Sequence, residues 1–203
     1  MRPALAPLCL ALLAALLGPP APAMAQDPDG GPEATVARFQ EALLAVWKAD
    51  VGFRERFQRL KKPVRTTHDL AYMARFSLGS VWDDLSEDER DRFVDVFGRL
   101  MIARYAERFA AYKGARFEQT ASQELGAEGY MVSTELVKGD EGRVRLDYIL
   151  NRGEAGWRIA NVLADGVSEL AMKRSDFTQA ARKWDIDRLI QGLEDRIEEM
   201  AEE

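Results

Sequence analysis

The stretch from Arg143 to Leu150 reads RVRLDYIL, and every second position, from Val144 to Leu150, is apolar. A strand with one buried face and one solvated face has this pattern, because successive side chains point to opposite sides of a sheet. Similar runs extend from Tyr130 to Lys138 and from Trp157 to Asp165. The central run is therefore predicted to be a strand with an apolar face that must be covered. Its apolar positions are Val144, Leu146, Tyr148 and Leu150.

Short connections rich in glycine join these runs, at residues 138–142 and 152–156. A parallel crossover needs a dozen or more residues, so loops of this length predict antiparallel hairpins. A weaker run from Arg116 to Leu125 supplies a further strand. The sequence thus predicts an α+β fold in which a four-stranded antiparallel sheet over residues 116–165 is covered on one face by helices.

Helical periodicity dominates residues 33–115, which precede the sheet. One helix is predicted from Glu33 to Ala49, and a second follows Gly52 and ends at Pro63, because proline cannot continue a helix interior. A third is predicted from Asp69 to Leu78. Two more helices are expected after the sheet, within residues 168–200.

Ser86 and Glu89 form a capping box, which predicts the start of a long helix that runs to Tyr112. The apolar face of this helix is rich in Phe, Tyr and Met. Each such side chain is most simply a core residue. Together they can also line a cavity, since methionine and aromatic side chains conform to irregular ligands.

The first 25 residues read as a secretory signal peptide. Arg2 is their only charged residue, Leu8 to Leu17 is an apolar run, and Ala23-Met24-Ala25 is a small-residue cleavage site. The run is too short for a membrane anchor, which needs about 20 apolar residues. Residues 26–32 are predicted to be a disordered leader and residues 33–203 a single domain. Cleavage removes the one cysteine, Cys9, so the mature domain has no disulfide, which favours the bacterial periplasm.

The mature chain is acidic. Without Arg2, one of 28 basic residues, it carries 27 basic and 34 acidic residues, a net charge of −7. This charge gives no electrostatic basis for nonspecific binding of nucleic acid.

Side chains that carry chemistry are scarce. The mature chain lacks cysteine, and its one histidine, His68, is expected at the surface or at a helix start. Phosphate loops, nucleophile elbows and calcium loops are absent from the sequence. No catalytic residue, metal site or cofactor is predicted, and the chain is interpreted as a binding protein. A hydrolase that uses a buried aspartate is the alternative.

Three segments resemble the MlaC family of periplasmic phospholipid carriers: residues 73–82, residues 144–148 and the run Asp165-Gly166-Val167-Ser168. The resemblance spans about residues 35–197. The run from Asp165 to Ala171 is most similar to a branch associated with hopanoid production. One departure is Arg182-Lys183-Trp184-Asp185, where the family usually carries a glycine before the last helix.

The resemblance implies an NTF2-like curved sheet wrapped by helices, with lipid acyl chains between them. It also implies a phospholipid or hopanoid-like ligand, and as partners an inner-membrane ABC transporter complex and an outer-membrane complex. Two other readings stay open. One is an NTF2-like enzyme with a carboxylate in its cavity, and the other is an envelope scaffold with a filled core and an exposed apolar patch.

The predicted cavity lining combines sheet residues chosen by alternation with apolar residues of two helices. Alternation is ambiguous in the second and fourth strands, where the opposite set (Met131, Val137, Ala160 and Val162) is nearly as apolar. The predicted lipid-binding residues are Met73, Phe97, Met101, Tyr105, Val132, Leu136, Val144, Leu146, Tyr148, Ile159 and Leu163.

Overall fold

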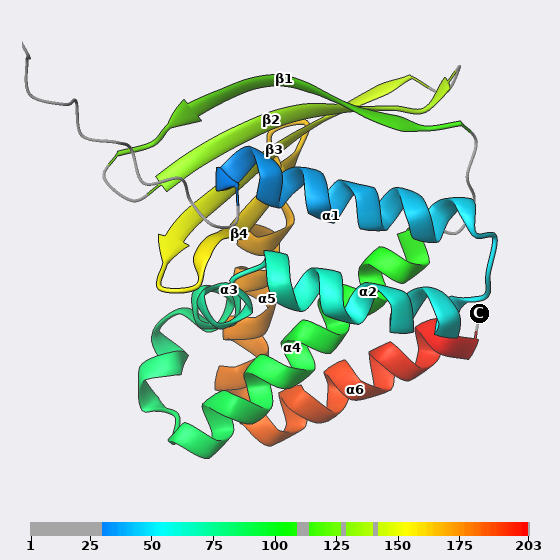
Figure 1. Ribbon diagram of the computed structural model, residues 1–203. Coiled ribbons are helices and arrows are strands. Elements are labelled where there is room, and N and C mark those ends of the chain that lie inside the picture. Colours follow the sequence, from blue (N-terminus) through cyan, green and yellow to red (C-terminus); the bar gives the residue numbers. More distant parts are fainter. Residues whose placement is uncertain (1–29, 109–113, 127–128, 140–141, 203) are drawn as a thin grey trace, which may run out of the picture.

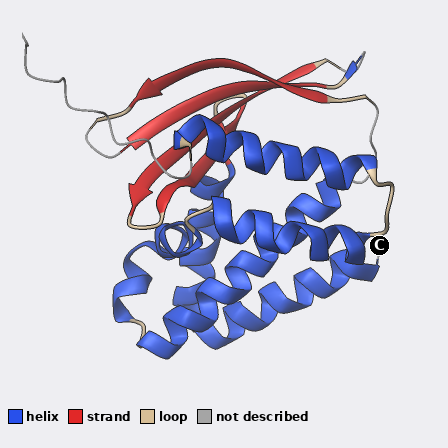
Figure 2. Cartoon of the chain, viewed as in Figure 1, coloured by secondary structure: helices blue, strands red, loops and turns tan. Residues whose placement is uncertain are grey.

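A curved antiparallel sheet forms one layer of the structure and helices form the rest (Figure 2). The computed structural model describes residues 30–108, 114–126, 129–139 and 142–202. The predicted signal peptide, most of the leader and the predicted end of the long helix lie outside these residues. No helix in the described ranges is both long enough and apolar enough to cross a bilayer.

The sheet has the strand order β1-β2-β3-β4-β5, and each strand is antiparallel to its neighbour. The predicted α+β class and the four-strand meander are confirmed. A fifth strand of two residues adds an edge beside β4, too short to show any pattern in the sequence. The strands are β1 (Arg116–Glu124), β2 (Gly129–Val137), β3 (Arg143–Gly153), β4 (Gly156–Ala164) and β5 (Val167–Ser168).

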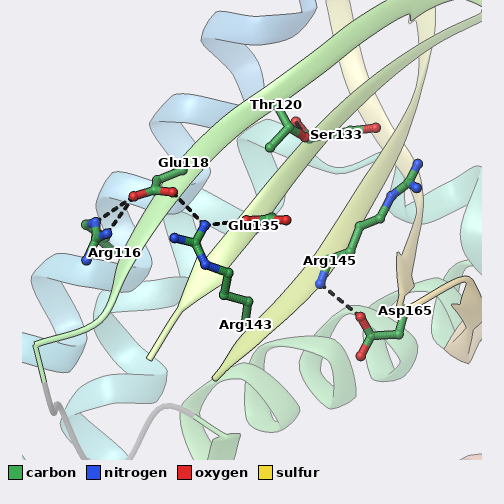
Figure 3. Close-up of polar contacts among 8 residues, drawn as sticks. All are labelled: Arg116, Glu118, Thr120, Ser133, Glu135, Arg143, Arg145 and Asp165. Carbon is green, nitrogen blue, oxygen red and sulfur yellow. Dashed lines mark hydrogen bonds and ion pairs between the residues drawn. The ribbon is translucent and has the colours of Figure 1, made fainter. Parts of the chain in front are cut away.

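The outer face of the sheet is polar and internally paired (Figure 3). Arg143 on β3 donates to Glu135 at 2.6 Å and to Glu118 at 3.0 Å, so one arginine joins three strands. Asp147 accepts from the Ser133 hydroxyl at 2.6 Å and pairs with Arg145 at 3.0 Å. Its ionic partner therefore lies on its own strand rather than across the sheet. These contacts leave the opposite face of β2 and β3 as the one that the helices cover.

The helices form layers beneath this inner face (Figure 1). α1 lies directly against the sheet and α2 packs on α1, while α4 crosses beneath and packs on α2 and α6. The buried residues form two clusters, one between the sheet, α1 and α2 and one among α3, α4, α5 and α6. The helices are α1 (Gly31–Lys48), α2 (Phe53–Thr67), α3 (Leu70–Leu78), the 3-10 helix η1 (Gly79–Asp84), α4 (Glu87–Arg108), α5 (Glu169–Trp184) and α6 (Ile186–Glu202).

The predicted end of the second helix at Pro63 is wrong, because α2 continues to Thr67. Proline removes one helical hydrogen bond, but burial of the following turn outweighs that loss. Val64 is fully buried and Thr67 is 2% exposed, and the Thr67 hydroxyl donates to the Pro63 carbonyl at 2.7 Å.

The predicted capping box is confirmed at the start of α4. The Ser86 amide donates to the Glu89 carboxylate at 2.8 Å, and the Glu89 amide donates to the Ser86 hydroxyl at 3.3 Å. The Asp69 carboxylate caps α3 by accepting a single hydrogen bond from the Tyr72 amide at 3.0 Å. These caps fix where α3 and α4 begin, and both helices deliver side chains to the cavity described next.

Candidate functional site

A cavity of about 180 Å³ lies between the inner face of the sheet and the helices α1, α3, α4 and α5. Its wall is apolar over most of its extent, and its charged residues lie on α4, on α5 and just after β2. Along α4, the lining residues Met101 and Arg108 are seven positions apart, which corresponds to about 10 Å of helix. The apolar lining consists of Phe39, Leu43, Trp47, Met73, Met101, Tyr105, Leu136, Val144, Leu146, Tyr148, Val162, Ala164 and Leu170.

Seven of the predicted residues meet at this cavity: Met73, Met101, Tyr105, Leu136, Val144, Leu146 and Tyr148. The contribution of α1 was not predicted, and it consists of Phe39, Leu43 and Trp47. Their helical stripe is visible in the sequence, but periodicity alone does not reveal which helix lies against the sheet.

Three predicted residues are buried elsewhere. Phe97 is 0% exposed and packs within the cluster of α3, α4, α5 and α6. Val132 and Ile159 are also 0% exposed and pack in the cluster between the sheet, α1 and α2. Each faces the protein interior as expected, but none of the three lines the cavity.

The prediction for Leu163 is wrong because of a β-bulge in β4. Ile149 pairs with Asn161 and Leu150 pairs with Ile159, which leaves Ala160 as an extra residue. Beyond such a bulge the alternation shifts by one position. Val162 and Ala164 therefore line the cavity, while Leu163 pairs with Asp147 and lies on the opposite face.

Behind the cavity wall, polar side chains are paired with one another. The Gln40 amide donates to the Thr134 hydroxyl at 3.0 Å and to the Tyr148 hydroxyl at 3.3 Å. Burial raises the pKa of Tyr148 to about 12. The Tyr148 hydroxyl therefore stays protonated and leaves no charge on the wall at neutral pH.

His68 lies at the boundary between α2 and α3, as expected, but it is buried, so the expected surface position is wrong. Its backbone ends α2 and then follows β4, where the Asp69 amide donates to the Ile159 carbonyl at 2.9 Å. This path carries the ring into the core, 4.6 Å from the Phe39 ring between centroids. This burial was not predictable from local sequence, because only the contact with β4 turns the residue inward.

The His68 ring contacts Thr67 through Nδ1 at 3.0 Å and Tyr105 through Nε2 at 3.2 Å. Because the Thr67 hydroxyl donates its proton to Pro63, it accepts from Nδ1–H, and the Tyr105 hydroxyl then donates to Nε2. Burial raises the pKa of Tyr105, and burial lowers the pKa of His68 to about 3. The pair is neutral and holds the Tyr105 ring in the cavity wall.

We expect the ring resonances of His68 to stay constant between pH 5 and 8 in NMR spectra, where it is the only histidine. Its folded pKa lies below the ordinary value of 6.5, so its contribution to stability is intact above pH 6.5. As pH falls towards 3, the unfolded state takes up the proton. The free energy of unfolding then declines by up to about 1.4 kcal/mol per pH unit from this group. The same resonances in urea should titrate near 6.5, and a midpoint there in the folded protein would contradict the burial.

The charged and polar residues of the lining are at least partly exposed, and Arg108 is fully exposed, so we infer that the cavity opens beside them. The charged and polar lining residues are Arg104, Arg108, Lys138, Asn161, Glu169 and Lys173. Arg108 forms an ion pair with Glu169, and Arg104 donates to Glu107 at 3.3 Å. Glu169 is the only carboxylate among the described lining residues, and it is paired at the mouth. A carboxylate buried in the wall, which the enzyme reading requires, is not among them.

The sequence matches the family described as MlaC protein over residues 38–195. The binding protein MlaC of an intermembrane phospholipid transport system in Haemophilus influenzae is 25% identical over 126 residues. That match covers 60% of this chain and 59% of the relative, less than two thirds of its length. A solved structure of a phospholipid-binding protein from Ralstonia solanacearum, in complex with a phospholipid, matches with a TM-score of 0.74 at 19% identity. It covers 84% of this chain and 99% of that one, and this likeness shows a shared fold.

Proposed function

The chain belongs to the MlaC family, and we propose that it is a periplasmic lipid carrier whose cavity holds the acyl chains of a phospholipid. The observation that carries the proposal is a cavity wall built from apolar side chains of the sheet, α1, α3 and α4, with charged residues only on α4, on α5 and just after β2. An alkyl ligand needs a dry wall and a polar mouth rather than a catalytic group. The names of the relatives support a phospholipid as the ligand.

The cavity volume of about 180 Å³ exceeds that of the engineered cavity of about 150 Å³ that takes up benzene. It therefore admits part of an acyl chain as it stands. Met73 and Met101 lie in the wall, and flexible methionine side chains can repack around a longer chain. We infer that uptake of a complete lipid widens the cavity between the sheet and α4.

Retention of such a ligand is strong, since each buried methylene contributes about 0.8 kcal/mol. Spontaneous release is correspondingly slow. The carrier therefore needs partners that open the cavity or compete with it for the lipid. We propose that it shuttles lipid between an inner-membrane ABC transporter complex and an outer-membrane complex, in line with the transport system for which the relative is named.

Lipid that copurifies with the protein from cells tests this proposal directly. We expect native mass spectrometry of the exported protein to show a bound species, and organic extraction to identify it as a phospholipid. A protein that emerges lipid-free and takes up no lipid from vesicles would contradict the carrier function and favour an envelope scaffold. A hopanoid in the extract would support a carrier but change its ligand.

The proposed organisation of the chain is a signal peptide at residues 1–25, a short leader and a single lipid-binding domain. The predicted boundary between leader and domain at residue 33 moves to Gly31, where α1 begins. Intact-mass analysis of the exported protein should place its first residue at Gln26. A mass that retains residues 1–25 would contradict the cleavage.

A further inference from the structure

The cavity mouth differs in charge from the rest of the protein. Four basic residues and one acidic residue line the cavity, although the chain as a whole has a net charge of −6. The cations come from different parts of the chain, with Arg104 and Arg108 on α4, Lys138 after β2 and Lys173 on α5. The fold thus brings positive charge from three separate segments to one side of an apolar cavity.

The two helices present these charges at matching spacing. Arg104 and Arg108 lie one turn apart on α4, and Glu169 and Lys173 lie one turn apart on α5, so each pair shares a helix face. Arg108 pairs with Glu169 across the mouth. A guanidinium has five N–H donors, so this ion pair leaves Arg108 with donors for a second anion.

Lys173 differs from Arg104 and Arg108 in forming no ion pair among the described residues. It is half-buried, and its ammonium lies 5.7 Å from the centre of the Phe177 ring. Burial is the largest cause that lowers the pKa of Lys173, and the nearby Arg104 is the second. Glu169 and Asp176 act in the opposite direction, and Arg108 adds to the decrease. An anion bound between α4 and α5 would offset this unfavourable environment.

We propose that Arg104, Arg108 and Lys173 form a phosphate subsite that holds the phosphodiester of the lipid whose acyl chains occupy the cavity. This inference rests on the proposed carrier function. Arginine binds phosphate oxygens through two N–H groups at once, and lysine contributes a point charge. The subsite fixes the orientation of the ligand, with its tails against Met101 and Leu146 and its head group between α4 and α5. An uncharged lipid such as a diacylglycerol gains nothing from these residues.

A competition between two lipids with the same chains tests the subsite. Delipidated mature protein is incubated with dioleoylphosphatidylglycerol and dioleoylglycerol in equal amounts, in micelles of an uncharged glycoside detergent, and the bound lipids are quantified by mass spectrometry. We expect about a tenfold preference for the phospholipid, the size expected for hydrogen bonds between charged groups. Replacing Arg104, Arg108 and Lys173 together by glutamine should reduce this preference to near one while total bound lipid persists.

Lys183→Gln is the control, because Lys183 lies on α5 like Lys173 but is exposed and does not line the cavity. If the triple variant does not fold, Lys173→Gln alone should still lower the preference about threefold. Equal binding of both lipids by the wild type would overturn the subsite but leave the carrier function standing. Uptake of neither lipid would overturn the carrier function itself.

Free phosphate is the other source of the same chemistry. Calorimetric titration of the delipidated protein with inorganic phosphate should give no binding at millimolar concentration, because the acyl chains supply most of the affinity. Phosphate binding as tight as that of phosphatidylglycerol would assign the mouth to a free anion and contradict a lipid subsite.

Discussion

Replacing Leu146 by aspartate should remove most of the lipid that copurifies with this protein. Leu146 lies on β3, is half-buried and forms part of the cavity wall. A carboxylate at this position must lose its hydration, at a cost of several kcal/mol, or take up a proton. A charged carboxylate in the wall also disfavours the binding of an alkyl chain beside it. We expect the ratio of extracted lipid to protein to fall at least tenfold.

The control is the same substitution at an exposed apolar residue. Val167 on β5 is 52% exposed, so Val167→Asp adds the same charge without touching the cavity wall. Circular dichroism should show that both variants fold, since Leu146 is not part of the fully buried core. Normal lipid content in folded Leu146→Asp protein would mean that the lipid lies elsewhere.

The sheet was predictable because its signals are local. Alternation in residues 143–150 and the glycine-rich hairpins around them follow from short-range geometry, and the structure places β3 and its neighbours accordingly. The cavity residues of β3 follow for the same reason. Val144, Leu146 and Tyr148 line the cavity because the alternation of this strand is unbroken there.

The rest of the site depends on contacts between distant segments. The bulge at Ala160 changes which residues of β4 face inward, so that Val162 rather than Leu163 faces the cavity. A shift of one residue cannot be seen in the sequence of a strand whose residues on both faces are apolar. His68 becomes buried only because the chain after α2 runs along β4. The basic mouth likewise arises from two distant segments, because α4 meets α5 there. Arg108 on α4 pairs with Glu169 on α5, and the two residues are 61 positions apart in the sequence.

Replacing Phe97 by alanine should lower the free energy of unfolding by about 3–5 kcal/mol, as is typical for a fully buried phenylalanine. The Phe97 side chain is 0% exposed, and its ring lies 6.2 Å from that of Phe93 within the cluster of α3, α4, α5 and α6. The sequence placed it on the cavity wall because it shares a helix face with Met101, four residues on. Both residues belong to the cluster of α3, α4, α5 and α6, but only Met101, one turn further along α4, also lines the cavity.

Urea unfolding and lipid extraction on the same variants distinguish a core residue from a wall residue. Phe97→Ala should shift the urea midpoint strongly, while the lipid-to-protein ratio of its folded fraction stays at the wild-type value. Phe97→Leu keeps most of the apolar volume and should cost less than about 1.5 kcal/mol, which serves as the matched control. An unchanged midpoint together with lost lipid would return Phe97 to the cavity wall. The boundary of the cavity along α4 would then lie at least one helical turn further from its mouth than the structure places it.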